Sequence, residues 1–178
     1  LNATPMQIAV AYAALGNGGI LHQPSFVKGQ QGESRRVLDA RIADDVLHMM
    51  QTVTEPGGTA TQAAILGYHV AGKTGTSRKA SAGGYSRRYI GYFAGLVPVE
   101  NPRFSMVVAI NDPTKGSYYG GIVAGPVFRN TMEGALRMMD VSPDNLETWL
   151  AAQAAAEAKR KPANAAALPA PVATGARA

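Results

Sequence analysis

The residues best suited to chemistry are a lysine and two threonines near the middle of the chain. Lys73, Thr74 and Thr76 supply an ammonium group and two hydroxyls, and Gly72 and Gly75 lie among them. Successive side chains of an extended strand point to opposite faces, so the two threonines share one face. Glycines let another backbone or a ligand approach closely. The pattern is typical either of a strand that binds an anionic, extended peptide or of an ordinary strand end with turn-forming glycines.

The same stretch also matches the phosphate-loop pattern of nucleotide-binding proteins. Residues 67–74 fit G-x-x-x-x-G-K-[ST], and residues 106–112 resemble an apolar strand that ends in a magnesium-binding aspartate. In a phosphate loop, however, the lysine opens a helix whose N-terminal amides hold the anion. The residues after Lys73 are hydroxyl-bearing, charged or glycine, and they disfavour a helix. A phosphate-loop NTPase therefore stays only as an alternative.

An ordered series of short motifs extends over most of the chain. The series is Gly67-Tyr68, Val70-Ala71-Gly72-Lys73-Thr74-Gly75-Thr76, Phe93-Ala94-Gly95, Pro98, Asn101-Pro102, Tyr118-Tyr119-Gly120-Gly121 and Pro126-Val127-Phe128. In this order the motifs resemble the C-terminal half of the transpeptidase domain of class B penicillin-binding proteins, most closely the division-specific enzymes of Gram-negative bacteria. The resemblance covers approximately residues 1–141. The lysine-threonine-glycine motif alone is weakly specific, and the series around it makes the match specific.

This resemblance implies a peptidoglycan D,D-transpeptidase that acts in septal cell-wall synthesis and is a target of β-lactams. In the family, a serine attacks the penultimate D-Ala carbonyl of a stem peptide ending in D-Ala-D-Ala and releases the terminal D-Ala. The acyl group then passes from the serine to an amine of a neighbouring stem. The resemblance also implies the periplasmic face of the inner membrane, an N-terminal anchoring helix outside this chain, and divisome membrane proteins as partners. No cofactor is expected. A D,D-carboxypeptidase with the same acyl-enzyme and a non-catalytic cell-wall-binding protein remain alternatives.

The resemblance also assigns roles to the residues of the central motif. Lys73 supplies positive potential beside the nucleophile, while Thr74, Gly75 and Thr76 bind the substrate carboxylate or the matching carboxylate of a β-lactam. The Thr76 backbone N–H forms half of the oxyanion hole, and one such donor is typically worth about 3 kcal/mol. Strict alternation puts Lys73 opposite Thr74, so both serve one cleft only at a twisted sheet edge. The pair Tyr118-Tyr119 either walls the cleft or only packs against the protein.

The nucleophile of the family is not recognisable in this chain. A serine hydroxyl needs a nearby base to become reactive. Residues 25–28 match Ser-x-x-Lys, but Phe26 and Val27 favour an extended segment rather than the helix that the family's serine opens, and no Ser-x-Asn occurs. We therefore expect the nucleophile and its partners to precede Leu1 in a longer protein, and this chain alone to be inactive and marginally stable.

Composition argues against several other classes of protein. The 178-residue chain is 46% apolar, which suffices for the core of one domain, and it contains no cysteine. His22, His48 and His69 lack metal-ligand spacing, so we expect structural or surface roles for them and no metal site. The net charge of +5 is not accompanied by a nucleic-acid-binding motif, and we expect no nucleic-acid partner.

Hydrophobic periodicity predicts an α+β fold, an antiparallel meander covered by helices. Strands are predicted at about 68–77, 89–98 and 104–112, with a long, mobile connection over 78–88. Helices are predicted after Thr4, with Pro5 and Gln7 completing the start, after Asp39, over about 123–139 and after Ser142-Pro143, and a helical turn is predicted within 59–64. The resemblance places this fold within a serine β-lactamase/transpeptidase-like domain.

The chain divides into three parts. Residues 1–141 correspond to the C-terminal part of the transpeptidase domain, and residues 142–161 to an alanine-rich terminal helix. Residues 162–178 are mostly alanine and proline with few core-forming side chains, so we expect a disordered tail.

Overall fold

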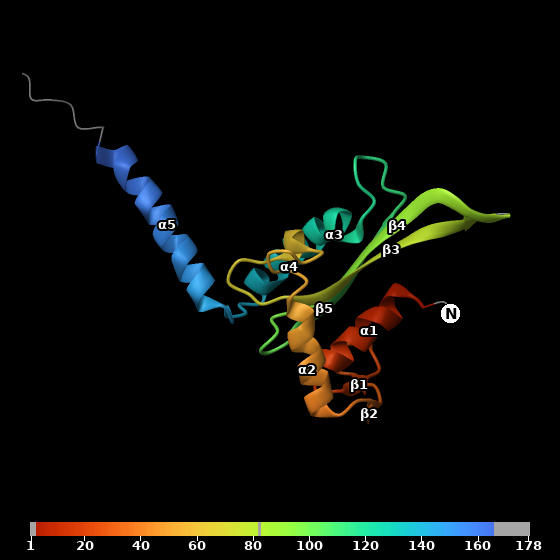
Figure 1. Ribbon diagram of the computed structural model, residues 1–178. Coiled ribbons are helices and arrows are strands. Elements are labelled where there is room, and N and C mark those ends of the chain that lie inside the picture. Colours follow the sequence, from red (N-terminus) through yellow and green to blue (C-terminus); the bar gives the residue numbers. More distant parts are fainter. Residues whose placement is uncertain (1–2, 82, 166–178) are drawn as a thin grey trace, which may run out of the picture.

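A three-stranded antiparallel sheet with helices on both faces forms the centre of the protein (Figure 1). The computed structural model describes residues 3–81 and 83–165, and the statements below refer to these residues. The sheet order is β3-β4-β5, a simple meander. The elements in chain order are α1 (Pro5–Gly16), β1 (Ile20–His22), β2 (Ser34–Arg36), α2 (Ala40–Gln51), the 3₁₀ turn η1 (Thr61–Ala63), β3 (Ala71–Ser81), β4 (Gly84–Val97), β5 (Phe104–Asn111), α3 (Gly120–Val123), α4 (Gly125–Met138) and α5 (Leu146–Ala165). The predicted α+β fold with an antiparallel meander is confirmed.

Alternation of side chains along β4 creates two apolar layers. Phe93 points toward α4, where its ring meets the edge of Phe128 with ring centroids 4.9 Å apart. Tyr92 and Ala94 point to the other face and line a groove beneath Tyr12 of α1. The central part of the sheet therefore lies between α1 on one face and α3 and α4 on the other, because alternate side chains of a strand pack into both layers.

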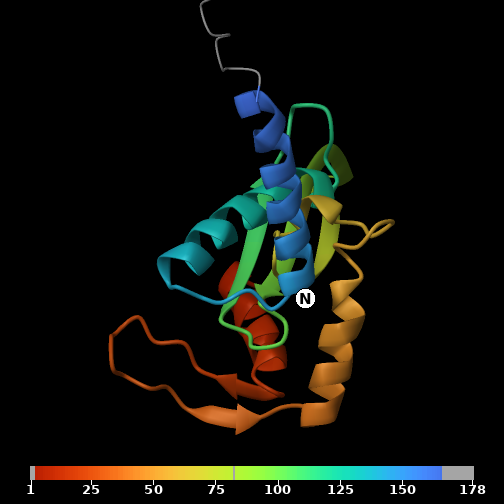
Figure 2. The ribbon, with the colours of Figure 1, turned by 90° about the vertical axis from the view of Figure 1, so that its left-hand side faces the viewer.

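The first two helices begin where the sequence predicts. Thr4 and Gln7 form a capping box, in which Thr4 Oγ1 accepts the Gln7 N–H at 3.2 Å and Gln7 Oε1 accepts the Thr4 N–H at 2.8 Å. Asp39 caps α2 by accepting the Arg41 N–H at 2.9 Å. The short antiparallel pair β1–β2 lies beside these helices, at the end of the molecule away from α5 (Figure 2).

The prediction of a long, mobile connection over residues 78–88 is wrong. β3 and β4 continue as a hairpin to Ser81 and Gly84, with an irregular register between Arg78 and Ala80. Local hydrogen bonds hold this extension, because Arg78 Nε donates to the Ser86 carbonyl at 3.2 Å. Charged and glycine-rich residues thus form ladder pairs that period-two hydrophobicity alone does not reveal.

Two helix predictions also change. The helix predicted over 123–139 is divided, since Ala124 ends α3 and caps α4, whose first turn contains Pro126. The last helix begins at Leu146 rather than after Ser142-Pro143, because the residues before it form other contacts described below. It reaches Ala165, past the expected end at 161, and leads away from the sheet (Figure 1). Residues 166–178, most of the predicted tail, lie outside the described residues.

Candidate active site on strand β3

β3 lies at the edge of the sheet. Among the described strands it pairs only with β4, in a register that places Lys73 opposite Ala94 and Thr76 opposite Gly91. An edge strand keeps a row of backbone N–H and C=O groups free, to which an extended peptide can add as a further strand. The predicted site residues therefore lie on one of the two edge strands of this sheet; the other edge strand is β5.

Thr74 and Thr76 point to the same face of β3, as alternation predicts. Thr74 Oγ1 lies 3.0 Å from the hydroxyl oxygen of Thr59, which comes from the loop between α2 and η1. Thr76 Oγ1 accepts the N–H of Gly120 at 3.2 Å, at the start of α3. Each hydroxyl is thus fixed by one contact from a neighbouring element. Both threonines remain accessible to solvent, with Thr76 the more exposed.

Lys73 points to the opposite face of the strand. Its side chain is exposed and its ammonium group donates to the Thr74 carbonyl at 3.2 Å. Within the described residues no carboxylate lies at ion-pair distance from it. Lys73 lines a cavity of about 410 Å³ between α1 and the sheet, where Tyr12 and Tyr92 are also found. An uncompensated cation beside an apolar cavity attracts anionic groups.

Two consecutive glycines allow α3 to approach the site strand. A Cβ on Gly120 would collide with the carbonyl oxygens of Gly75 and Tyr92, and one on Gly121 would collide with the Thr59 carbonyl. No other residue type leaves enough space here. The glycine pair therefore lets the Gly120 N–H reach Thr76 and keeps the loop that contains Thr59 in place.

Three tyrosines stack beside Thr76. The rings of Tyr89 and Tyr118 are nearly parallel with centroids 4.1 Å apart, and Tyr119 follows at 4.7 Å. Tyr89 lies on β4 two residues from Gly91, the ladder partner of Thr76. A hydrogen bond with Tyr119 raises the pKa of Tyr118, and charge interactions with Tyr119 and Tyr89 raise it further. The sequence reasoning named Tyr118 and Tyr119 but missed Tyr89, whose signal is its strand position near Gly91.

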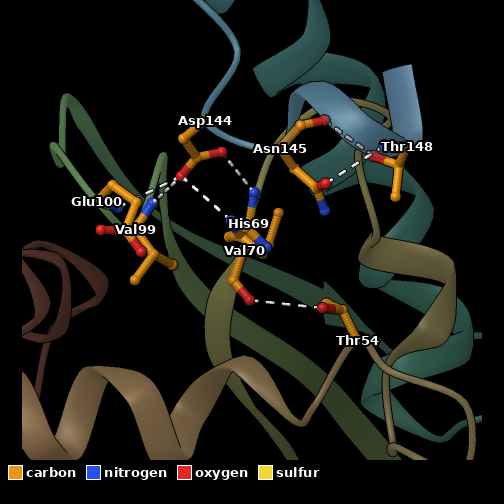
Figure 3. Close-up of polar contacts among 8 residues, drawn as sticks. All are labelled: Thr54, His69, Val70, Val99, Glu100, Asp144, Asn145 and Thr148. Atoms are coloured by element: carbon orange, nitrogen blue, oxygen red, sulfur yellow. Dashed lines mark hydrogen bonds and ion pairs between the residues drawn. The ribbon is translucent and has the colours of Figure 1, made fainter. Parts of the chain in front are cut away.

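The segment before β3 is held by the largely buried carboxylate of Asp144, 75 positions further along the sequence than His69 (Figure 3). The Asp144 side chain, only 10% exposed, accepts the backbone N–H of His69 at 2.7 Å, of Val99 at 3.1 Å and of Glu100 at 3.3 Å. Thr54 Oγ1 lies 3.4 Å from the carbonyl of Val70, just before the strand. Asp144 thereby ties the segment before β3 to the turn between β4 and β5.

We call residues 141–145, with their contacts to residues 67–69 and 99–100, the clamp. Further contacts support it. The Tyr68 hydroxyl donates to the Val141 carbonyl at 2.6 Å, and the Asn145 N–H donates to the Gly67 carbonyl at 3.0 Å. Trp149 of α5 lies directly over Gly67, whose φ of 83° favours glycine. Burial raises the pKa of Tyr68, with further contributions from Asp144 and Asp140.

Comparison with known proteins identifies the family. The family model for the penicillin binding protein transpeptidase domain matches residues 1–133. This chain belongs to the penicillin-binding protein transpeptidase family. Peptidoglycan D,D-transpeptidase FtsI of Escherichia coli (strain K12) is 46% identical over 150 residues, which are 83% of this chain and 26% of the relative. Probable peptidoglycan D,D-transpeptidase PenA of Neisseria gonorrhoeae is 41% identical over 145 residues, 80% of this chain and 25% of the relative.

A solved structure shows the same fold. The transpeptidase domain of penicillin-binding protein 3 from Burkholderia pseudomallei, in its apo form, superposes with a TM-score of 0.72 at 35% identity, covering 80% of this chain and 44% of that one. The chain spans about a quarter of the length of the curated relatives that it matches.

The structure rejects two alternatives that the sequence left open. Lys73 and Thr74 lie inside β3 rather than at the start of a helix, so the phosphate-loop hypothesis is wrong. Ser25 lies in an exposed turn, where its Oγ accepts the Val27 N–H at 3.1 Å and lies 3.3 Å from Gln30 Oε1. It opens no helix among the described residues, and its hydroxyl is engaged within the turn.

Two further features are absent from the part of the chain that the structure describes. No group of His, Asp and Glu side chains in residues 3–81 and 83–165 is arranged to hold a metal ion. None of the helices in this part of the chain combines the length and apolar character needed to cross a bilayer.

Proposed function

We propose that this chain supplies the lysine-threonine-glycine strand of a peptidoglycan D,D-transpeptidase active site. The enzyme would cross-link stem peptides that end in D-Ala-D-Ala through a serine acyl-enzyme, and β-lactams would acylate the same serine. Membership of the transpeptidase family and 46% identity to a peptidoglycan D,D-transpeptidase support this proposal. The single observation that carries it is the edge of β3 that no other described strand pairs with. Two hydroxyls lie on one face of this strand, and on the other lies a lysine that has no carboxylate partner among the described residues.

The roles of the site residues follow from this arrangement. The donor stem peptide lies along β3 as an added strand, and its terminal carboxylate accepts hydrogen bonds from Thr74 and Thr76 across Gly75. Lys73 supplies positive potential on the side where the nucleophile arrives, which lowers the cost of developing negative charge. The backbone N–H of Thr76 donates to the oxyanion of the tetrahedral intermediate. The tyrosines that stack beside Thr76 wall one side of the cleft and keep water away from the bound peptide.

The serine nucleophile, its lysine and the proton-shuttling Ser-x-Asn segment come from residues other than those described. The cavity of about 410 Å³ that Lys73 lines, between α1 and the sheet, is an apolar surface on which a nucleophile-bearing helix can pack. The nucleophile would thereby reach the face of β3 on which Lys73 lies. This placement explains why Lys73 and the two threonines point to opposite faces of the strand.

We further propose that the full-length protein acts in septal cell-wall synthesis at the periplasmic face of the inner membrane, anchored there by an N-terminal helix and assembled with divisome membrane proteins. Support comes from the similarity to the FtsI protein of Escherichia coli. Cross-linking of the membrane-anchored protein in dividing cells, followed by identification of the attached proteins, tests the partner proposal. Attachment only to proteins of lateral wall synthesis would contradict it.

A labelled-penicillin gel on the full-length protein tests the catalytic proposal. We expect one covalent band that an excess of unlabelled penicillin removes. Absence of a band from the folded protein would sink the proposal and favour a non-catalytic cell-wall-binding protein. Release of D-Ala from a stem peptide without formation of cross-linked dimer, in the presence of an acceptor amine, would instead assign a D,D-carboxypeptidase.

A further inference from the structure

The hydroxyls of Thr74 and Thr76 have different kinds of hydrogen-bond partner in the neighbouring elements. Thr76 Oγ1 receives a hydrogen from the Gly120 N–H, which can only donate. The Thr76 hydroxyl hydrogen is therefore free to point to a ligand. Thr74 Oγ1 faces the Thr59 hydroxyl at 3.0 Å, and either oxygen can be the donor. If the Thr59 hydroxyl donates to Thr74, the Thr74 hydrogen is available to the ligand. If Thr74 donates to Thr59, only a lone pair of the Thr74 oxygen is available.

Thr59 is held in place by its own loop and by α3. The Ala60 N–H donates to the Val53 carbonyl at 2.9 Å, and the Gly58 N–H donates to the Glu55 carbonyl at 2.8 Å. Ala60 is buried, and Gly121 packs against the Thr59 carbonyl so closely that no Cβ fits between them. The backbone that presents the Thr59 hydroxyl to Thr74 is therefore fixed on both sides, although the side chain itself is exposed.

A bound carboxylate decides the direction of the hydrogen bond. A hydrogen bond to a charged acceptor is stronger than one between two neutral hydroxyls. Thr74 therefore donates to the carboxylate, and its oxygen is then free to accept from Thr59. In a chain of hydrogen bonds each member polarises the next, so a donor behind Thr74 strengthens the bond that Thr74 makes to the ligand.

We propose that Thr59 is a positioning residue for the ligand carboxylate: its hydroxyl donates to Thr74 Oγ1 and directs the Thr74 hydrogen toward the ligand, as the Gly120 N–H does for Thr76. This inference rests on the proposed function only in taking a carboxylate as the ligand of β3. Thr59 itself does not touch the substrate. Its contribution is confined to ligands that carry the carboxylate.

Three variants of the full-length protein test the proposal. Thr59→Val removes the hydroxyl with little change of shape, Thr59→Ser keeps a hydroxyl, and Thr52→Val removes an exposed hydroxyl from the start of the same loop, where it bonds only to the Met49 carbonyl. The measurement is the acylation rate as a function of concentration for a penicillin, and for the same penicillin with its carboxylate esterified. Thermal melting of each variant reports on folding.

We expect Thr59→Val to weaken binding of the penicillin about three- to tenfold, in the half-saturating concentration rather than in the maximal rate. Thr59→Ser and Thr52→Val should match the wild type, and the ester should not distinguish Thr59→Val from the wild type. Equal loss for penicillin and ester, a loss in Thr59→Ser as large as in Thr59→Val, or wild-type behaviour of Thr59→Val would each overturn the inference. Failure of the wild type itself to be acylated would instead contradict the proposed function.

Discussion

Two adjacent regions of the chain differ in how they are held: residues 67–69, just before β3, and residues 73–76, within β3. Just before the strand, the His69 N–H donates to the Asp144 carboxylate, which is 10% exposed and also accepts the N–H groups of Val99 and Glu100 in the turn between β4 and β5. Within the strand, Thr74 and Thr76 each have a single partner behind them and an open side toward solvent. Lys73 has no carboxylate partner among the described residues. The Asp144 carboxylate of the clamp is largely buried and accepts three hydrogen bonds, although Nδ1 of the neighbouring His69 is buried without a hydrogen-bond partner among the described residues. The site, in contrast, is open to solvent and keeps hydrogen-bonding capacity for a ligand.

The two regions therefore have different roles: the clamp positions the backbone before β3, and the site binds the ligand. Buried polar groups that are fully paired fix the position of the backbone, and removing one member leaves its partners unsatisfied at a cost in stability. The exposed Lys73 contributes little to folding, and the hydroxyls of Thr74 and Thr76 keep hydrogen-bonding capacity for a ligand. We therefore expect the larger changes in the free energy of unfolding from substitutions in the clamp, and the larger changes in acylation from substitutions in the site.

The largest expected effect is that of Lys73→Ala on acylation. Loss of the cation that β3 supplies beside the nucleophile should lower the second-order rate of acylation by penicillin roughly a hundredfold or more. The free energy of unfolding should stay within about 0.5 kcal/mol of the wild type, since the side chain is exposed. Acylation kinetics of the full-length protein test the predicted loss of rate, and urea denaturation tests the predicted free energy of unfolding. Wild-type acylation would mean that the strand is not the substrate cradle.

The clamp should show the reverse pattern. Asp144→Ala leaves three backbone N–H groups without an acceptor, so we expect it to lower the free energy of unfolding by about 3–5 kcal/mol. Asp144→Asn keeps one acceptor oxygen and should cost about half as much. At a temperature where both variants remain folded, acylation should fall far less than in Lys73→Ala. Denaturation midpoints that match the wild type would show that the clamp does not stabilise the protein.

Sequence reasoning identified the parts of the fold that depend on neighbouring residues. The caps of Thr4 and Asp39 follow from side chains within three residues, and both are present. The three strands follow from period-two hydrophobicity, and the edge position of Lys73 and Thr74 follows from the need to use both faces of one strand. These features require no knowledge of distant contacts.

Features that depend on distant contacts were not predictable. Thr59 meets Thr74 across 15 positions of sequence, and Asp144 meets His69 across 75. Neither Thr59 nor Asp144 belongs to a distinctive sequence motif. The helix predicted after Ser142-Pro143 starts later because Asp144 is engaged by three backbone N–H groups, which no local propensity reveals. The extended hairpin likewise depends on pairing between β3 and β4.

A third prediction removes one hydroxyl from the site. Thr76→Val is nearly isosteric and keeps the backbone N–H proposed for the oxyanion hole. It removes one hydrogen bond to a charged carboxylate, a loss of about 1.5–3 kcal/mol, or roughly ten- to a hundredfold in acylation. The free energy of unfolding should also fall, by about 1–3 kcal/mol, because the buried Gly120 N–H loses the hydroxyl that accepts its hydrogen bond. The same rates measured with the esterified penicillin provide the control. If the ester loses as much as the acid, the hydroxyl does not recognise the carboxylate.

The smallest expected effect comes from the matching deletion in the clamp. Tyr68→Phe removes the hydroxyl that donates to the Val141 carbonyl at 2.6 Å, so we expect a loss of about 1 kcal/mol in the free energy of unfolding and no change in acylation. Tyr68→Phe and Thr76→Val each remove one hydroxyl, the first from the clamp and the second from the site. A loss of acylation as large as that of Thr76→Val would erase the distinction between the two regions.

The stability gap between Tyr68→Phe and the wild type should also depend on pH in one direction. Burial, with Asp144 and Asp140, raises the pKa of Tyr68 above its ordinary value of 10.0, so folding favours the neutral phenol. This contribution is fully present below the unfolded pKa and is lost as the pH rises through the higher folded pKa. The gap should therefore be constant in neutral solution and shrink as the pH passes 10.0. Urea denaturation of both proteins along a pH series measures it, with titration of all other groups cancelling in the difference. A gap that widens above this pH would mean that the folded protein favours the ionised phenol.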